Sequence, residues 1–209
     1  MISLSEILHT IAQALMIPCL IILIILMAGA VWQIGDIVVE YIAERRKHKC
    51  NVPQLLRDVH AAGADGLAEL IENSGLLRRQ KKALLELAES RGLPKDTLTA
   101  LAERLLATEE ARNARTTSIT DMIAKLGPMF GLLGTLIPLG PGVVALGQGD
   151  TVTLSQSMSI AFDTTIAGII TAAVCALIST ARRRWYASDV ADLEAIMEGC
   201  LQEMKEAER

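Results

Sequence analysis

Four polar side chains that could carry protons lie inside two long runs of the sequence that are almost free of charge. Thr135 lies in residues 126–149, and Asp163, Thr164 and Thr165 lie in residues 151–181. A threonine hydroxyl both donates and accepts a hydrogen bond, so it can relay or orient a proton without adding a buried charge. A carboxyl group inside a membrane span is rare and is commonly tied to ion movement. These residue types therefore indicate a proton path through a membrane.

A structural interpretation of the same side chains stays open. Threonines in membrane helices often donate their hydroxyl to a carbonyl one turn earlier in their own helix. Asp163 could be a neutral structural carboxyl, hydrogen-bonded to Ser159 or to an adjacent subunit, since burial favours the uncharged form of an acid. Spacing alone does not separate these interpretations.

Small residues in these runs recur at helical spacing. At about 100° per residue, one face of residues 151–181 carries Ala161, Thr165, Gly168, Ala172, Cys175 and Ser179. Asp163 points away from Thr165, on a face with Gln156 and Ser159. Small side chains let membrane helices approach closely. We therefore expect five residues to face helices within or between subunits: Gly131, Gly134, Ala161, Gly168 and Ala172.

Three uncharged or nearly uncharged runs are long enough to cross a bilayer, which takes about 20 apolar residues. They are residues 7–35, 126–149 and 151–181, in a chain that is 51% hydrophobic and only 3% aromatic. This composition favours an integral membrane protein of the all-α class. Pro18 is expected to bend the first helix, and the prolines and glycines of residues 138–142 are expected to break or kink the second.

The residues outside these runs are polar and helical in pattern. Pro53 starts a helix, residues 73–75 form a turn, and Pro94 starts a helix with no breaker before Gly127. The predicted organisation is an external N-terminus with the first span (residues 1–43), a cytoplasmic helical bundle (44–121), a core of spans two and three (122–181), and a cytoplasmic C-terminal helix (182–209).

Basic residues set the expected orientation. None precedes Arg45, a basic cluster lies within residues 44–49, Arg112, Arg115 and Lys125 precede the second span, and residues 182–184 are all arginine. The link between the second and third spans has no Lys or Arg. The positive-inside rule therefore predicts an external N-terminus and a cytoplasmic C-terminus.

Other function classes find little support. The four cysteines have no metal-binding spacing and are expected to be free thiols, and the three histidines are separated. No phosphate-binding loop, zinc signature or nucleophile elbow occurs, so we expect no enzyme activity, no cofactor and no metal. The basic cluster at residues 44–49 fits a topology signal better than a nucleic-acid site.

Two short segments resemble the MotA/TolQ/ExbB proton-channel family. In GPMFGLLGT (residues 127–135), Pro128, Gly131, Gly134 and Thr135 fit the segment that opens the second span of that family. In AFDTTIAGI (residues 161–169), Ala161, Phe162, Thr165 and Gly168 fit its third-span segment. Both motifs occur in a chain with three spans and a cytoplasmic helical insert, which is the layout of the family.

The resemblance implies a multi-pass protein of the inner membrane. It implies a homopentamer around a dimer of single-span partners resembling ExbD, TolR or MotB, in which proton flow drives motion of one part against the other. It also implies that threonines at the positions of Thr135 and Thr165 line the path, and that the partner supplies an essential aspartate. A glutamate common in the TolQ and ExbB branch is replaced here by Ile160, and Asp163 stands nearby as a possible substitute.

The predicted function is thus a stator subunit that couples proton motive force to work on a partner, as in ion transport and energised protein transport. The alternative is a membrane scaffold or sensor that conducts nothing and recruits proteins through its cytoplasmic bundle. Asp163 and the threonines favour the channel.

Overall fold

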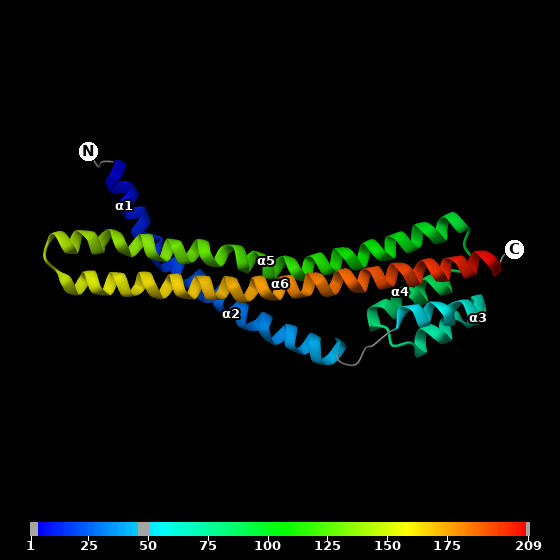
Figure 1. The fold of residues 1–209 in the computed structure, drawn as a ribbon. Helices are drawn as coiled ribbons and strands as arrows, with labels where there is room; N and C mark the ends of the chain where they lie inside the picture. The colour runs from blue at the N-terminus through cyan, green and yellow to red at the C-terminus, as the bar shows by residue number, and fades with distance from the viewer. Residues whose placement is uncertain (1–3, 46–50, 208–209) are drawn as a thin grey trace. The chain divides into compact units, whose positions relative to one another are not determined.

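The computed structural model describes residues 4–45 and 51–207, and every element in these ranges is a helix (Figure 1). The helices are α1 (Leu4–Ala14), α2 (Met16–Glu40), a short π-helix η1 (Tyr41–Arg45), α3 (Val52–Asn73), α4 (Arg78–Glu89), α5 (Lys95–Gly147) and α6 (Thr151–Ala207). Three helical stretches are long and apolar enough to cross a membrane: Thr10–Ala43, Lys95–Gly147 and Thr151–Lys205. The prediction of an all-α chain with three membrane-spanning helices is confirmed. Cys50 and most of the basic cluster at residues 44–49 lie outside the described residues.

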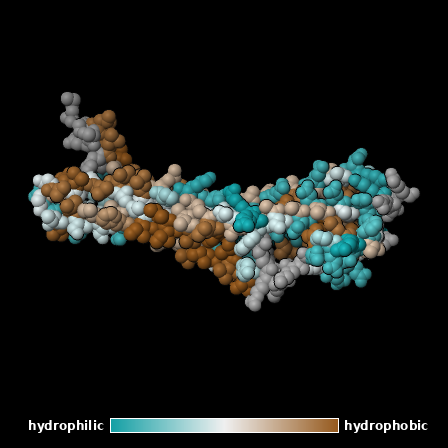
Figure 2. Space-filling model, in the orientation of Figure 1, coloured by the Kyte–Doolittle hydropathy of each residue, from teal (hydrophilic) through white to brown (hydrophobic). Residues whose placement is uncertain are grey.

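The chain folds as two units. The hairpin unit comprises Met1–Asp36 and Thr117–Ala181, and the bundle unit comprises Ile37–Thr116 and Arg182–Arg209. Figure 2 shows hydrophobic side chains covering α2 and the membrane half of α5 and α6, and hydrophilic ones over the bundle unit. Both long helices contribute to both units, because α5 and α6 each continue without interruption past their apolar parts.

In the hairpin unit, α5 and α6 run antiparallel and side by side (Figure 1). They are joined by a tight turn at residues 148–150, where Gly149 has a positive φ of 78° that suits a residue without a side chain. Asp150 caps the start of α6, because its carboxylate accepts hydrogen bonds from the backbone N–H groups of Val152 (3.2 Å) and Thr153 (3.1 Å).

Prolines act differently in the two membrane helices. The helical assignment is interrupted at Leu15, three residues before Pro18, which lacks the N–H that would bond the Ala14 carbonyl. In contrast, α5 stays helical through Pro138 and Pro141. Of the predicted break or kink at residues 138–142, the break is therefore wrong. Pro138 is buried there, and Gly142 lies against Ser157 of α6, so contact with the second helix holds the segment in helical form.

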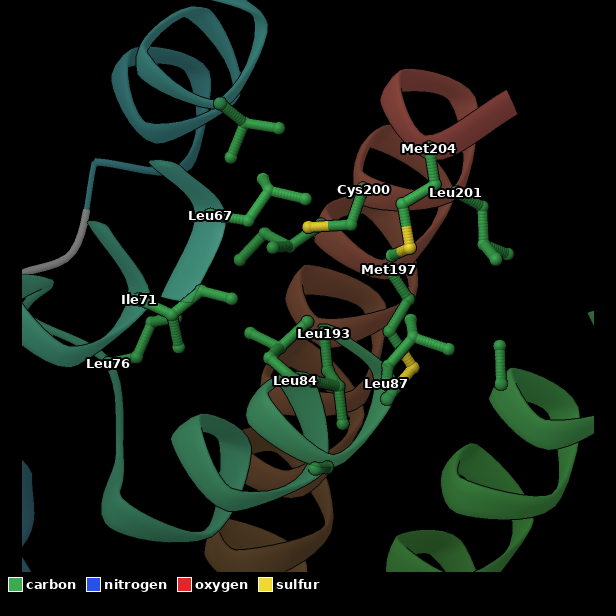
Figure 3. Packing of buried hydrophobic residues seen from close by; sticks show 14 of the residues in the cluster. Leu67, Ile71, Leu76, Leu84, Leu87, Leu193, Met197, Cys200, Leu201 and Met204 are labelled. Carbon is green, nitrogen blue, oxygen red and sulfur yellow. The ribbon is translucent and has the colours of Figure 1, made fainter. Parts of the chain in front are cut away.

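The bundle unit has a core of large apolar side chains, seen from close by in Figure 3. Residues of α3, α4, the first part of α5 and the last part of α6 meet there, including Ile71, Leu84, Leu87, Leu98, Leu193 and Ile196. Helix α3 bends at Gly63, which has φ 63° and ψ −174°. The sequence prediction that the helix after Pro94 runs straight into the second span is confirmed by α5.

One of the three consecutive arginines after the third span is buried in the bundle unit. Arg182 is 1% exposed, and its Nε donates a hydrogen bond to Oε2 of Glu40 at 3.1 Å. Arg183 and Arg184 are exposed. A buried arginine depends on its carboxylate partner, because an unpaired charge away from water is strongly destabilising.

Candidate functional site

Glycines hold α5 and α6 in close contact along the hairpin. A Cβ built on Gly134 would lie 2.6 Å from Cβ of Thr164, and one built on Gly168 would lie 2.6 Å from the carbonyl oxygen of Gly127. Such distances are below van der Waals contact, so no larger residue fits without moving a helix. Gly131 lies against Gly168, and Ala172 against Gly127. All five residues expected to face helices are buried, and Gly131, Gly134, Gly168 and Ala172 lie against the other helix of the hairpin.

These contacts fix the register of the two antiparallel helices. Gly127 lies opposite Ala172, Gly131 opposite Gly168, and Gly134 opposite Thr164. The four residues from Gly127 to Gly131 match four residues back along α6, and the three residues from Gly131 to Gly134 match four. By this register Thr135 and Thr165 lie at similar heights in the hairpin, within about two helical rises of 1.5 Å each. Asp163 lies at the same height on α6.

The three threonines differ in exposure. Thr164 is 5% exposed and packs against Gly134, whereas Thr135 and Thr165 are half-buried. Periodicity placed Thr165 on the small-residue face, but the face that packs on α5 contains Thr164 and leaves Thr165 at its edge. The predicted and the observed faces of α6 thus differ by one residue at this level. The observed contact places Thr164 against Gly134, and Gly168 against Gly131.

All three hydroxyls donate to their own helix. Thr135 Oγ1 lies 2.6 Å from the carbonyl oxygen of Leu132, and Thr165 Oγ1 lies 3.0 Å from that of Ala161. Thr164 Oγ1 lies 2.9 Å from the Ile160 oxygen and 3.0 Å from the Ala161 oxygen. A hydroxyl that donates to a carbonyl keeps lone pairs that accept a further hydrogen bond. Thr135 and Thr165, which are half-buried, can therefore still receive a donor from outside the chain, whereas Thr164 is enclosed between the two helices.

Helix α2 covers one side of the hairpin. Leu26 and Ala30 form a buried cluster with Ile123 and Cys175, and Phe130 packs against this cluster. The Cys19 thiol donates to the Phe130 carbonyl at 3.5 Å. Thr135 is five residues beyond Phe130, which places it about 140° around α5 at 100° per residue. Thr135 therefore faces away from the side that α2 covers.

Asp163 lies on the outside of the hairpin. Its side chain is exposed, as are those of Phe162 and Ile166 on either side. Among the described residues no hydrogen bond joins Asp163 to Ser159, so only the alternative of a contact with an adjacent subunit remains for a structural role.

A polar cluster at the other end of the hairpin was missed by sequence reasoning. The hydroxyl of Ser179 donates to Oδ1 of Asp121, a contact between residues 58 positions apart. Thr120 is 0% exposed and Thr117 is 7% exposed on the neighbouring face of α5. Pairing the glycines of the two spans would have revealed this cluster. An antiparallel register that places Gly131 opposite Gly168 also places Thr120 opposite Ser179.

Most of the buried polar side chains described in the hairpin are hydroxyls. No group of three or more His, Cys, Asp or Glu side chains is placed to hold a metal ion within the described ranges. The cysteines that the structure describes, Cys19, Cys175 and Cys200, are free thiols and are buried. The hairpin therefore carries several hydroxyl groups, with Thr164 in the contact between α5 and α6 and Thr135 and Thr165 at its edge.

Comparison with protein families gives a match to the MotA/TolQ/ExbB proton channel family over residues 70–195. The match extends from the bundle through both helices of the hairpin, so it includes Thr135, Asp163, Thr164 and Thr165. A search of curated proteins found no match to the chain.

Proposed function

The chain belongs to the MotA/TolQ/ExbB proton channel family, and we propose that it is a stator subunit that couples proton motive force to mechanical work on a partner protein. The observation that carries this proposal is the height shared by Thr135 and Thr165. The antiparallel helices α5 and α6 are held in register by glycines. Each helix carries one of these two hydroxyls at a similar level, at the edge of the contact between the helices. A carboxyl group of a partner helix placed at this level can exchange a proton with both.

The four polar residues take different roles in this proposal. Thr135 and Thr165 accept or orient the proton, because their hydroxyl oxygens keep free lone pairs. Thr164, which packs on Gly134, sets the separation of the helices and so positions the other two. Asp163 points away from Thr165 and acts at the contact between subunits or as a second proton site.

The exposed surface of the hairpin supports an oligomer in a membrane. Large apolar side chains on α5 and α6 are more than half exposed in the single chain, among them Leu132, Leu136, Phe162, Ile166 and Ile169. Lipid or other subunits must cover them, because a surface this apolar is unstable in water. The proposed assembly is a homopentamer around a dimer of single-span partners, with an acid in the partner's span.

The proposed orientation puts the N-terminus outside and the bundle unit in the cytoplasm, in the inner membrane. Cys200 is a poor probe of this orientation, because its side chain is 1% exposed. Gln148 in the turn and Ser188 in α6 are exposed. With the native cysteines removed, an impermeant thiol reagent should label Gln148→Cys in intact cells and should leave Ser188→Cys unlabelled until the cells are opened. Labelling of Ser188→Cys from outside would overturn this topology.

The function is tested by reconstitution. The protein is purified together with its single-span partner, placed in liposomes, and proton entry is followed with a pH-sensitive dye under a potassium diffusion potential. A channel gives flux that exceeds that of empty liposomes and falls to that level in Thr135→Val and Thr165→Val, which keep the shape and remove the hydroxyl. A non-conducting scaffold gives no flux with any partner, and that result would replace the proposal.

A further inference from the structure

Three oxygen-bearing side chains lie at the end of the hairpin far from the turn, and two of them are hydrogen-bonded to each other. Asp121 accepts a hydrogen bond from the hydroxyl of Ser179, which is 3% exposed. Thr120 lies opposite Ser179 in the register set by the glycines, and its side chain is completely buried. Asp121 and Ser179 are therefore in contact across α5 and α6, and Thr120, next to Asp121 in the chain, lies at the same level with its hydroxyl shielded from solvent.

The hydroxyl of Thr120 differs from those of other threonines in α5 and α6 in its hydrogen bonding. Its oxygen is buried and has no hydrogen-bond partner among the described residues. Other threonines of α5 and α6 donate to a carbonyl of their own helix, namely Thr99, Thr108, Thr116, Thr135, Thr164, Thr165 and Thr180. A buried hydroxyl without a partner is destabilising, so its presence beside a carboxylate calls for a bound group that it can contact.

We propose that Thr120, Asp121 and Ser179 form a binding site for a monovalent cation, with Na⁺ as its natural probe. Hard cations of this kind bind to carboxylate, hydroxyl and carbonyl oxygens. Asp121 is the carboxylate of this cluster and gives it a preference for a cation over an anion. A divalent ion would demand more carboxylates than the cluster holds, and a transition metal would demand nitrogen or sulfur ligands.

The site is separate from the proposed proton path. Asp121 precedes Thr135 by 14 residues on the same helix, which is about 21 Å at 1.5 Å per residue. All three ligands belong to one chain, so the site forms without a partner protein. Its occupancy can be measured on the purified chain alone, and the result does not depend on whether the protein conducts protons.

Binding is measured on the full chain in lipid nanodiscs at constant ionic strength, with N-methylglucamine chloride replacing the added salt. Radioactive Na⁺ gives the affinity directly, and the midpoint of thermal unfolding gives a second measure, since a ligand that binds only the folded state raises it. The expected result is saturable Na⁺ binding and an unfolding midpoint that rises with Na⁺. Absence of saturable binding in the wild type would overturn the proposal.

Two variants assign the site to its ligands. Asp121→Asn removes the charge and Thr120→Val removes the free hydroxyl while keeping its shape, and each should weaken Na⁺ binding by about tenfold or more, as loss of a coordinating contact does. The matched control is Thr180→Val, an exposed threonine of the same hairpin, which should bind as the wild type does. If Thr120→Val binds Na⁺ with wild-type affinity, or if the control weakens binding equally, the assignment is wrong. Elution as the wild-type oligomer shows that a variant is folded.

Discussion

The two units are built from the same element, the α-helix, but their contacts use side chains of opposite size. In the bundle unit the core consists of leucine, isoleucine and methionine, with Leu87 and Ile196 completely buried. In the hairpin unit the contact between α5 and α6 is made by glycine, alanine and threonine, and the apolar side chains point outward. Large side chains fill the core of the bundle unit, whereas most of those on α5 and α6 in the hairpin unit point outward.

The solvent explains this difference. Water drives large apolar side chains together, so the bundle gains stability from the area that it buries. Lipid is as apolar as leucine and provides no such force, so membrane helices associate through close packing and polar contacts. A channel also benefits from this arrangement, because small residues leave the polar groups of the hairpin close to one another.

The largest effect is expected from bulk in the glycine contact. Gly168→Leu should prevent the hairpin from closing, because even a Cβ there lies 2.6 Å from the Gly127 oxygen. Native mass spectrometry should then find no folded oligomer. The control is Gly140→Leu, since a Cβ at Gly140 meets nothing within 4 Å in the same chain. An oligomer of Gly168→Leu equal to that of the wild type would contradict the packing described here.

A cavity in the bundle should have a smaller but substantial effect. Leu87→Ala is expected to lower the free energy of unfolding of the bundle by about 2–5 kcal/mol, as is typical of a buried leucine. Resistance to limited proteolysis in detergent measures it, and Leu93→Ala is the control because Leu93 is 40% exposed. If both variants resist equally, the bundle core does not stabilise this unit.

The smallest effect is expected at the turn. The side-chain hydrogen bond from Thr153, followed by the Thr153 backbone N–H, lowers the pKa of Asp150. A lowered pKa means that the cap stabilises the hairpin at neutral pH and that this contribution is lost as the pH falls through the pKa of the folded state. The difference in unfolding midpoint between wild type and Asp150→Ala should therefore shrink on acidification. A difference that is constant from neutral to acidic pH would show that the charge of Asp150 does not contribute.

The sequence predicted the features that depend on local chemistry. Hydropathy gave the three spans, Pro53 and Pro94 marked helix starts, and the lack of a breaker after Pro94 predicted the long helix α5. Each of these depends on residues within a few turns of one another, so no knowledge of the partner helix was needed.

What the sequence could not provide depends on how two helices pair. The helix at Pro138 and Pro141 persists because α6 packs against it, which the local rule for proline does not include. Asp121 and Ser179 meet only once the register is known. The same register decides between Thr164 and Thr165, since helical periodicity alone cannot locate the centre of a contact to within one residue.

The most direct test of the account is proton flux per assembled channel in liposomes, compared between the two units. Leu87→Ala should reduce the amount of assembled protein but leave the flux of each channel unchanged. Thr165→Val should assemble normally, and its proton flux should not exceed that of empty liposomes. Thr165→Ser, which keeps a hydroxyl at this position, should conduct protons. Wild-type flux per channel from both Thr165→Val and Thr135→Val would mean that these threonines only pack, and would contradict the proposed path.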